Sequence, residues 1–233
     1  MADAATTPEK DPILSHGAHE IRTPVTVILG YIRMLTSERM GAVTESQRKA
    51  LGEMQKTAAK LSALADEMSE LSVLVAGATK FNRAPVDLGA LIQDGVATLP
   101  PLPDREVSVR VINEAPGAAV DADPLKLRNA MTWIITAHRR ELVTSDELCV
   151  LVHRITQDGR PTLQVTVAGA DRVDELRRVP ASGLVTFEEV RGGVGYTLSI
   201  ARRIIAALGA QLWSPAESPK AAAVLFFPEA QTA

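Results

Sequence analysis

The sequence has little of several features that mark common protein classes. Its single cysteine, Cys149, excludes a disulfide framework and fits a reducing compartment. No apolar run reaches the roughly 20 residues of a membrane span, and residues 1–10 lack the apolar core of a signal peptide. The net charge is −3 and no basic block occurs, so nucleic acid is not an expected partner. We therefore expect a cytoplasmic protein without a membrane anchor.

Two apolar seams of helical period occupy the N-terminal third of the chain. In the first, Asp11-Pro12 is a favourable helix start, and apolar residues then recur at alternating spacings of four and three. They are Leu14, Ala18, Ile21, Val25, Ile28, Ile32 and Leu35. The second seam follows a capping box predicted from Thr44 and Gln47. It comprises Leu51, Met54, Ala58, Leu61, Ala65, Met68, Ser72 and Val75.

These seams predict an antiparallel helical hairpin over residues 11–76. A single hairpin leaves one side of its seams open, so we predict a homodimer in which two hairpins close a four-helix bundle. The alternative is a bundle completed by the C-terminal half, but that half lacks helices of matching length. Only a tail over residues 1–10, expected to be disordered, precedes the hairpin, so we expect no sensor domain within the chain.

The first predicted helix carries a group of polar residues that stability alone does not explain. His19 lies one position past the seam, and Thr23 lies one turn further along the same face, so both should point to solvent. Pro24 cannot donate a hydrogen bond to the carbonyl of Glu20, which predicts a bend beside His19. An outward histidine and glutamate next to a helix-interior proline indicate a reactive site.

This stretch resembles the phospho-acceptor box of two-component histidine kinases, and it reads His19-Glu20-Ile21-Arg22-Thr23-Pro24-Val25, followed by Gly30-Tyr31. The resemblance implies that His19 carries a phosphoryl group and that Glu20 is the neighbouring acid or base. It also implies that Thr23 positions water when a partner is dephosphorylated, with Arg22 and Pro24 in support. The implied partners are the receiver domains of response regulators.

After a linker over residues 77–83 the periodicity changes, and short strands alternate with helices over residues 84–233. We expect helices over 123–142 and 194–208, strands over 148–155 and 162–167, and a hairpin turn at Asp158-Gly159. This mixture predicts an α+β sandwich. The order of elements resembles the catalytic ATP-binding domain that follows the hairpin in histidine kinases.

The resemblance implies an ATP-binding domain of the histidine kinase type that has become degenerate. The two asparagines of the family, one of which holds magnesium, align with Trp133 and Ala137, and neither side chain offers the oxygen ligand that magnesium prefers. We interpret Trp133 as a core residue that fills space a nucleotide would take. The adenine-reading loop keeps Gly169 but has no aspartate in the reading position.

The phosphate loop of that domain is also altered. It keeps Gly193 and Gly195, but Thr197 replaces a third glycine, and a β-branched residue there would crowd a phosphate near the backbone. The segment over residues 171–191 is short for an ATP lid. We therefore expect no bound cofactor, with ATP and magnesium needed only if the chain is an active kinase.

The favoured hypothesis is a phosphorelay histidine phosphotransferase, or pseudokinase, that shuttles a phosphoryl group between His19 and receiver aspartates. Three alternatives stay open: a cytoplasmic kinase that autophosphorylates His19 from ATP, a non-enzymatic scaffold or antagonist of a kinase or receiver, and a receiver phosphatase that acts through Thr23. No metal site is expected, because no further Cys or His ligands lie near His16 and His19 in the sequence.

Overall fold

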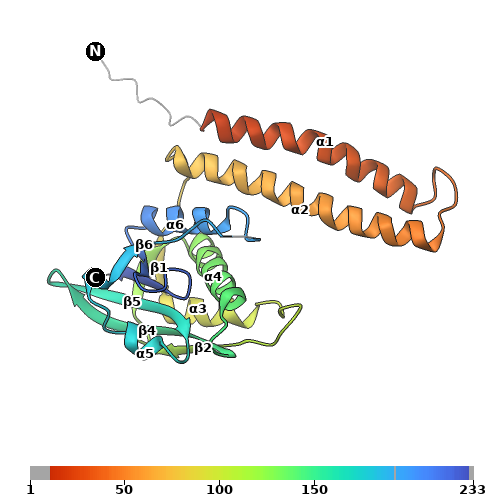
Figure 1. The fold of residues 1–233 in the computed structure, drawn as a ribbon. Helices are drawn as coiled ribbons and strands as arrows, with labels where there is room; N and C mark the ends of the chain where they lie inside the picture. Colours follow the sequence, from red (N-terminus) through yellow and green to blue (C-terminus); the bar gives the residue numbers. More distant parts are fainter. Residues whose placement is uncertain (1–10, 192, 231–233) are drawn as a thin grey trace, which may run out of the picture. The chain divides into compact units, whose positions relative to one another are not determined.

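The structure is a computed structural model that describes residues 11–191 and 193–230, so the tail predicted over residues 1–10 lies outside the described residues. The chain divides into two compact units, with the boundary between Thr79 and Lys80. The N-terminal unit is a helical hairpin and the C-terminal unit combines helices with β-sheet (Figure 1). The predicted α+β class is therefore confirmed.

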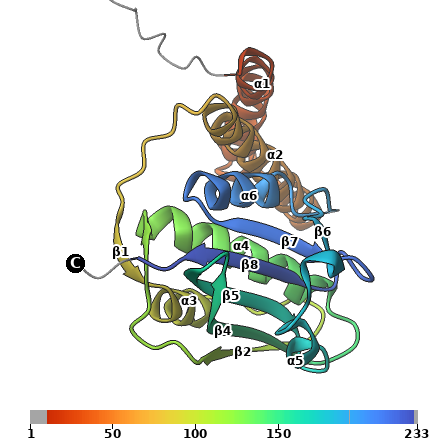
Figure 2. The ribbon, with the colours of Figure 1, turned by 90° about the vertical axis from the view of Figure 1, so that its left-hand side faces the viewer.

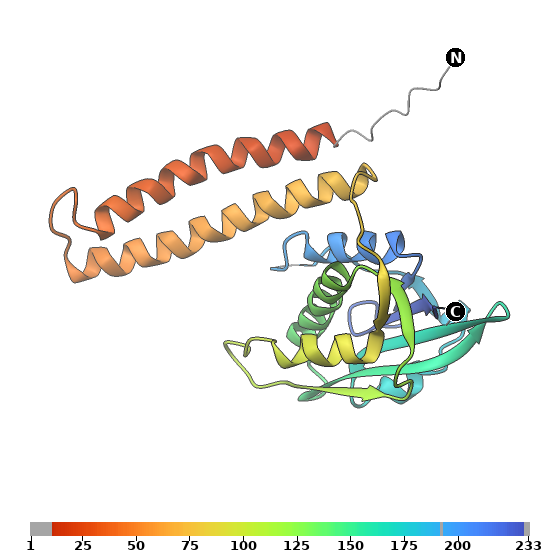
Figure 3. The ribbon, with the colours of Figure 1, turned by 180° about the vertical axis from the view of Figure 1, so that it is seen from behind.

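The N-terminal unit is built from two long helices that lie side by side (Figures 1 and 3). They are α1 (Pro12–Thr36) and α2 (Glu45–Val75). Both helices begin at the predicted caps. The Asp11 carboxylate accepts hydrogen bonds from two amides of the first turn, and Thr44 and Gln47 form a reciprocal capping box. These caps satisfy amides that have no partner within the helix.

Only half of each apolar seam is buried within the hairpin. Every seventh residue packs between the two helices, and these residues are Ala18, Val25, Ile32, Leu51, Ala58, Ala65 and Ser72. The seam residues between them are more exposed: Ile28 is 43%, Met54 52% and Leu61 41% exposed. Together with Glu53, Thr57 and Ala58 they line an open apolar cavity of about 360 Å³. A single hairpin therefore presents an unpartnered apolar face.

The C-terminal unit alternates helices with short strands. Its helices are α3 (Leu88–Ala97), α4 (Pro124–Glu141), α5 (Val173–Leu176) and α6 (Thr197–Ala207), and a 3-10 helix, η1, spans Ala181–Gly183. Its strands are β1 (Ala84–Asp87), β2 (Ser108–Asn113), β3 (Ala119–Ala122), β4 (Glu147–Gln157), β5 (Arg160–Gly169), β6 (Leu184–Thr186), β7 (Gln211–Pro215) and β8 (Ala223–Pro228).

The strands form a large sheet in the order β2-β4-β5-β8-β7-β6 and a small sheet of β1 and β3. Within the large sheet β2 and β4 pair in parallel, whereas the other neighbours are antiparallel. Helices α4 and α6 pack together on one face of this sheet, and α5 lies on the other (Figure 2). The tight turn at Asp158 and Gly159 joins β4 to β5, as predicted, and both residues have positive φ.

The face of the large sheet covered by α5 is called the outer face below. Cys149 and Leu151 of β4 pack there against α5. Because side chains alternate along a strand, His153 and Ile155 share this face. The register places His153 opposite Gln164 of β5, and Gln164 opposite Phe226 of β8. A row of polar and aromatic side chains therefore crosses the outer face.

Several element bounds differ from the sequence predictions. Strands β4 and β5 are longer than the predicted 148–155 and 162–167, and each extends past both of its predicted ends. Helix α6 begins at Thr197 rather than at residue 194, because Gly193 and Gly195 have φ of +76° and +59°, which an α-helix does not allow. The segment over residues 171–191, which is short for an ATP lid, contains α5, η1 and β6, three elements of four residues or fewer that have no periodicity to detect.

Candidate functional site

The predicted phospho-acceptor residues lie on an uninterrupted part of α1. His19, Glu20, Thr23 and Pro24 are all exposed. The Thr23 hydroxyl donates a hydrogen bond to the His19 carbonyl at 3.2 Å, which ties this threonine to its own helix. Pro24 has no N–H to donate to the Glu20 carbonyl, yet the helix continues to Thr36. The imidazole of His19 is therefore accessible to a second protein.

Arg22 joins the two helices next to this exposed histidine. Its Nη2 donates to the Asp66 carboxylate at 2.8 Å and to the Ser69 hydroxyl at 3.2 Å, both on α2. The ion pair is exposed, so its contribution to stability is small, and its main effect is to hold α1 and α2 in register beside His19. Sequence reasoning missed Asp66, although its place one residue past the seam residue Ala65 was a usable signal.

The residues aligned with the expected nucleotide site lie on α4, at the end of β5, and just before and at the start of α6. Trp133 and Ala137 lie one turn apart on α4, and Ala137 is buried. Trp133 is only partly buried, so it is not a fully enclosed core residue, and its filling of nucleotide space stays a prediction. Gly169 is still in strand β5, where a Cβ atom would lie 2.4 Å from a carboxylate oxygen of Asp171 and clash with it. No larger side chain fits at Gly169 without displacing Asp171.

The loop before α6 is held by its own hydrogen bonds. The Gly193 carbonyl accepts a hydrogen bond from the Arg140 guanidinium at 3.1 Å. The Thr197 hydroxyl donates to the Val194 carbonyl at 2.7 Å, so this side chain closes the turn around Gly195. The threonine that replaces the third glycine thus has a structural role in the first turn of α6.

A buried arginine that sequence reasoning missed fills the space between α4 and the segment before α6. The Arg191 side chain is 0% exposed, and its Nη1 donates to the Glu141 carboxylate at 2.6 Å. Its Nε donates to the Glu188 carbonyl at 3.0 Å, and its guanidinium stacks 5.2 Å from the centre of the Phe187 ring. Its Nη2 lies 3.4 Å from Nε2 of His138, the residue after Ala137.

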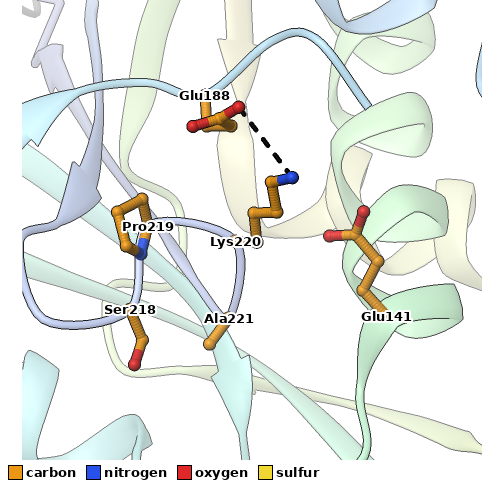
Figure 4. Close-up of a pocket in the computed structure, with 6 residues that line it drawn as sticks. All are labelled: Glu141, Glu188, Ser218, Pro219, Lys220 and Ala221. Atoms are coloured by element: carbon orange, nitrogen blue, oxygen red, sulfur yellow. Dashed lines mark ion pairs between the residues drawn. The ribbon is translucent and has the colours of Figure 1, made fainter. Parts of the chain in front are cut away.

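Arg191 also reaches the turn between β7 and β8. Its Nη1 donates to the Lys220 carbonyl at 3.2 Å. Beside it, Glu141, Glu188 and residues 218–221 line a cavity of about 560 Å³, with an ion pair of 4.0 Å between Lys220 and Glu188 (Figure 4). We call His138, Glu141, Phe187 and Arg191 the Arg191 cluster. Through its guanidinium, Arg191 connects α4, the segment before α6 and the turn between β7 and β8.

Burial in this cluster and, second to it, the nearby positive charge of Arg191 lower the pKa of His138 to about 4. The Nδ1 atom of His138 lies 2.7 Å from the Ile134 carbonyl, which is consistent with a neutral ring that donates its proton there. Burial also lowers the pKa of Arg191, while the Glu141 carboxylate opposes that change. The cluster is therefore built around a neutral histidine and an arginine paired with a carboxylate.

We expect acidification from pH 7 to pH 5 to destabilise the C-terminal unit by about 2 kcal/mol through His138. The folded pKa is about 4 and the ordinary value is 6.5, so the unfolded chain binds more protons between these values. Stability is therefore full above pH 6.5 and falls as the pH drops toward 4. Urea unfolding at both pH values measures this change, and His138→Gln should remove it. Equal pH dependence in both proteins would contradict the assignment, since His153 titrates in each.

Two further sequence predictions concern metals and membranes. Within residues 11–191 and 193–230, no group of three His, Cys, Asp or Glu side chains is placed to hold a metal ion. Across the same ranges, no helix combines the length and the apolar composition needed to span a bilayer.

Comparison with known proteins finds a domain match for the N-terminal unit and similar proteins that span most of the chain. Residues 10–77 match the His Kinase A (phospho-acceptor) domain. The chain is similar to the sensor protein GacS of Pseudomonas syringae pv. syringae, at 26% identity over 215 residues. It is also similar to the sensor histidine kinase GacS of Pseudomonas protegens, at 26% identity over 212 residues. Each alignment covers 87% of this chain but 23% of the relative.

Solved structures share the fold. A crystal structure of full-length ShkA in complex with AMPPNP matches 97% of this chain and 47% of that chain, with a TM-score of 0.69 and 23% identity. The Acinetobacter baumannii histidine kinase AdeS matches 91% of this chain and 98% of that chain, with a TM-score of 0.56 and 16% identity. Histidine kinase ThkA, in complex with the response regulator protein TrrA, matches 94% of this chain and 61% of that chain, with a TM-score of 0.52 and 15% identity. The chain therefore carries a phospho-acceptor hairpin that matches the His Kinase A domain, followed by an α/β domain whose fold is similar to that of the ATP-binding domain of histidine kinases.

Proposed function

We propose that this chain is a phosphorelay phosphotransferase, which takes a phosphoryl group from a receiver aspartate onto His19 and passes it to a second receiver. The proposal rests on a contrast between the phospho-acceptor helix α1 and the helix α4 of the expected nucleotide site. His19 is exposed within the matched phospho-acceptor domain, whereas α4 has no oxygen ligand at Trp133 or Ala137, and its Glu141 is paired with Arg191. A response regulator bound to ThkA, a protein of the same fold, supports a receiver as partner.

The chemistry is a direct transfer between two nucleophiles. A lone pair on one imidazole nitrogen of His19 attacks the phosphorus of the aspartyl phosphate and forms an N–P bond. The P–O bond to the aspartate breaks, and the aspartate leaves as a carboxylate. The proton on the other ring nitrogen passes to water or to Glu20, the neighbouring exposed carboxylate. Transfer to a second receiver reverses these steps, and any magnesium is supplied by the receiver.

An active kinase is the second candidate, because two observations favour it. ShkA, which shares this fold, was solved with the ATP analogue AMPPNP. In this chain Gly193 and Gly195 both keep positive φ, a conformation that lets a loop backbone approach a phosphate. Under this reading His19 would be phosphorylated from ATP.

Two labelling reactions separate these candidates. One supplies [γ-32P]ATP with magnesium, and the other supplies a panel of receiver domains phosphorylated with acetyl [32P]phosphate. We expect label from the receivers and none from ATP. Label from ATP alone would overturn the proposal in favour of an autophosphorylating kinase. Label from neither source would contradict both and favour a non-enzymatic scaffold.

We also infer that two copies of the chain pair through the open face of the hairpin. The exposed seam residues Ile28, Met54 and Leu61 are apolar and contiguous with the buried seam, so a second hairpin would bury them. A stable apolar interface of this kind favours an isologous dimer.

Leu61→Glu should therefore convert the dimer to monomers, because dimerisation would bury an unpaired carboxylate. We expect the dissociation constant of the dimer to rise about 100-fold or more. Analytical ultracentrifugation over a range of concentrations measures this. Lys60→Glu, at the exposed neighbouring position, is the matched control and should stay dimeric. A wild-type chain that is monomeric throughout, or a dimeric Leu61→Glu variant, would sink the inference.

A further inference from the structure

The outer face of the large sheet contains a cavity that phosphotransfer does not use. Its volume is about 310 Å³, at the lower end of the roughly 300–1,000 Å³ typical of small-molecule sites. It lies between the outer face and the segment that contains η1. Its lining residues are Ile155, Thr156, Gln157, Gln164, Val179, Ala181, Leu184, Gln211, Trp213 and Phe226.

The lining defines the charge and the shape of a ligand. Among the described residues that line the cavity, none is charged, so a charged guest would lose its hydration without gaining a counter-ion. Trp213 and Phe226 contribute aromatic rings, and Leu184 and Ile155 contribute aliphatic surface, which suit a flat apolar ring system. The volume accommodates a molecule with two fused rings.

The polar side chains that line the cavity include Thr156, Gln157, Gln164 and Gln211, and hydrogen bonds within the protein show what Gln164 and Gln211 can still offer a ligand. Gln211 accepts a hydrogen bond from Nε1 of Trp213 at 3.2 Å through its Oε1, which leaves its NH₂ group as a donor. Gln164 is buried, and its Nε2 donates to the Leu176 carbonyl and to the Thr166 hydroxyl, both at 3.2 Å. Its Oε1 is therefore the atom with which it can accept a bond from a guest. Among the polar groups of the cavity, Gln211 thus offers a donor and Gln164 an acceptor.

A buried histidine beside the cavity wall is incompletely satisfied. His153 is 9% exposed and lies opposite Gln164 in the sheet register, on the outer face. Within the part of the chain that the structure describes, its Nδ1 is the buried side-chain atom that lacks a hydrogen-bond partner. Buried polar atoms are nearly always paired, so an orphaned nitrogen next to a lining residue points to a polar guest or water nearby.

We propose that this cavity binds a neutral, planar, two-ring molecule that carries a carbonyl acceptor and an N–H donor, as a fused-ring lactam does. The carbonyl would accept from the Gln211 amide, the N–H would donate to Gln164 Oε1, and the rings would lie against Trp213 and Phe226. This chemistry is independent of phosphotransfer at His19, and it assigns a small-molecule site to the C-terminal unit.

The test uses 2-quinolone, a neutral bicyclic lactam, and the fluorescence of Trp213. The chain has two tryptophans, so Trp133→Phe leaves Trp213 as the only tryptophan reporter. We expect 2-quinolone to change the Trp213 emission with saturation below about 1 mM. Ala181→Phe, which places a ring in the cavity, should weaken binding about tenfold or more. Ala97→Phe, the same change at an exposed residue of α3, is the matched control and should leave binding unchanged.

An analogue separates specific binding from general affinity for flat rings without altering the protein. N-methyl-2-quinolone keeps the carbonyl but has no N–H, so we expect it to bind about three- to tenfold more weakly. Three results would each overturn the assignment: no saturable change with 2-quinolone, equal binding to the Ala181→Phe variant, or equal binding of the N-methyl analogue.

Discussion

Replacing His19 with alanine is expected to abolish phosphoryl transfer from every receiver that labels the wild-type chain. The imidazole nitrogen is the only nucleophile that the proposed step uses, and alanine leaves no atom to form the N–P bond. His19 is exposed and its side chain holds no part of the hairpin core, so the variant should fold normally. Transfer of 32P from receivers phosphorylated with acetyl [32P]phosphate measures the effect, and label should fall to background.

A second histidine provides the matched control. His16 lies three residues earlier on α1 and is also exposed, so His16→Ala removes the same side chain from the same helix. It should keep transfer close to the wild-type level. Label that persists in His19→Ala, or disappears equally in His16→Ala, would remove His19 from the role assigned to it. Receiver binding that persists in His19→Ala while transfer is lost would separate docking from chemistry and exclude a pure scaffold.

Arg191→Ala is expected to destabilise the C-terminal unit by about 3 kcal/mol, because it removes a buried guanidinium that pairs with a partly exposed carboxylate and donates to two carbonyls. The Glu141 carboxylate and the carbonyls of Glu188 and Lys220 would lose their donor, and the Phe187 ring would lose its stacked cation. Urea unfolding measures this, with tryptophan fluorescence as the signal. Both tryptophans lie beyond Lys80, so the signal reports the C-terminal unit alone.

Two variants calibrate this loss. Arg178→Ala removes an exposed arginine from the same part of the chain and should change stability by less than about 0.5 kcal/mol. Arg191→Lys keeps the charge but loses the planar fork of donors, so its stability should lie between those of Arg191→Ala and the wild type. An Arg191→Ala variant as stable as Arg178→Ala would show that the cluster contributes nothing to the fold.

The helices could be predicted because local chemistry specifies where they begin. Asp11, Thr44 and Asp123 are followed at once by the amides that they cap, so a short stretch of sequence contains all the relevant atoms. The seams of the hairpin are equally visible, since a period of seven requires no knowledge of the tertiary structure.

The Arg191 cluster could not be predicted, because its parts lie far apart in the sequence. Arg191 meets Glu141 across 50 residues and Lys220 across 29, and only the assembled unit brings them together. Sequence reasoning identified the missing asparagines at Trp133 and Ala137 but assigned the vacated space to Trp133, a residue the structure leaves partly exposed. The link between Arg22 and Asp66 also joins distant residues, across 44 positions, but it could have been anticipated, because each residue directly follows a seam position of its helix.

Pro24 weakens the helix near His19, five residues before it. In an α-helix each amide normally donates a hydrogen bond to the carbonyl four residues earlier. Here the hydrogen bond to the Glu20 carbonyl cannot form, because Pro24 has no N–H. Flexing this turn therefore breaks fewer bonds than flexing its neighbours. We therefore expect the imidazole to tilt toward a docked protein more easily than a side chain on a fully bonded turn.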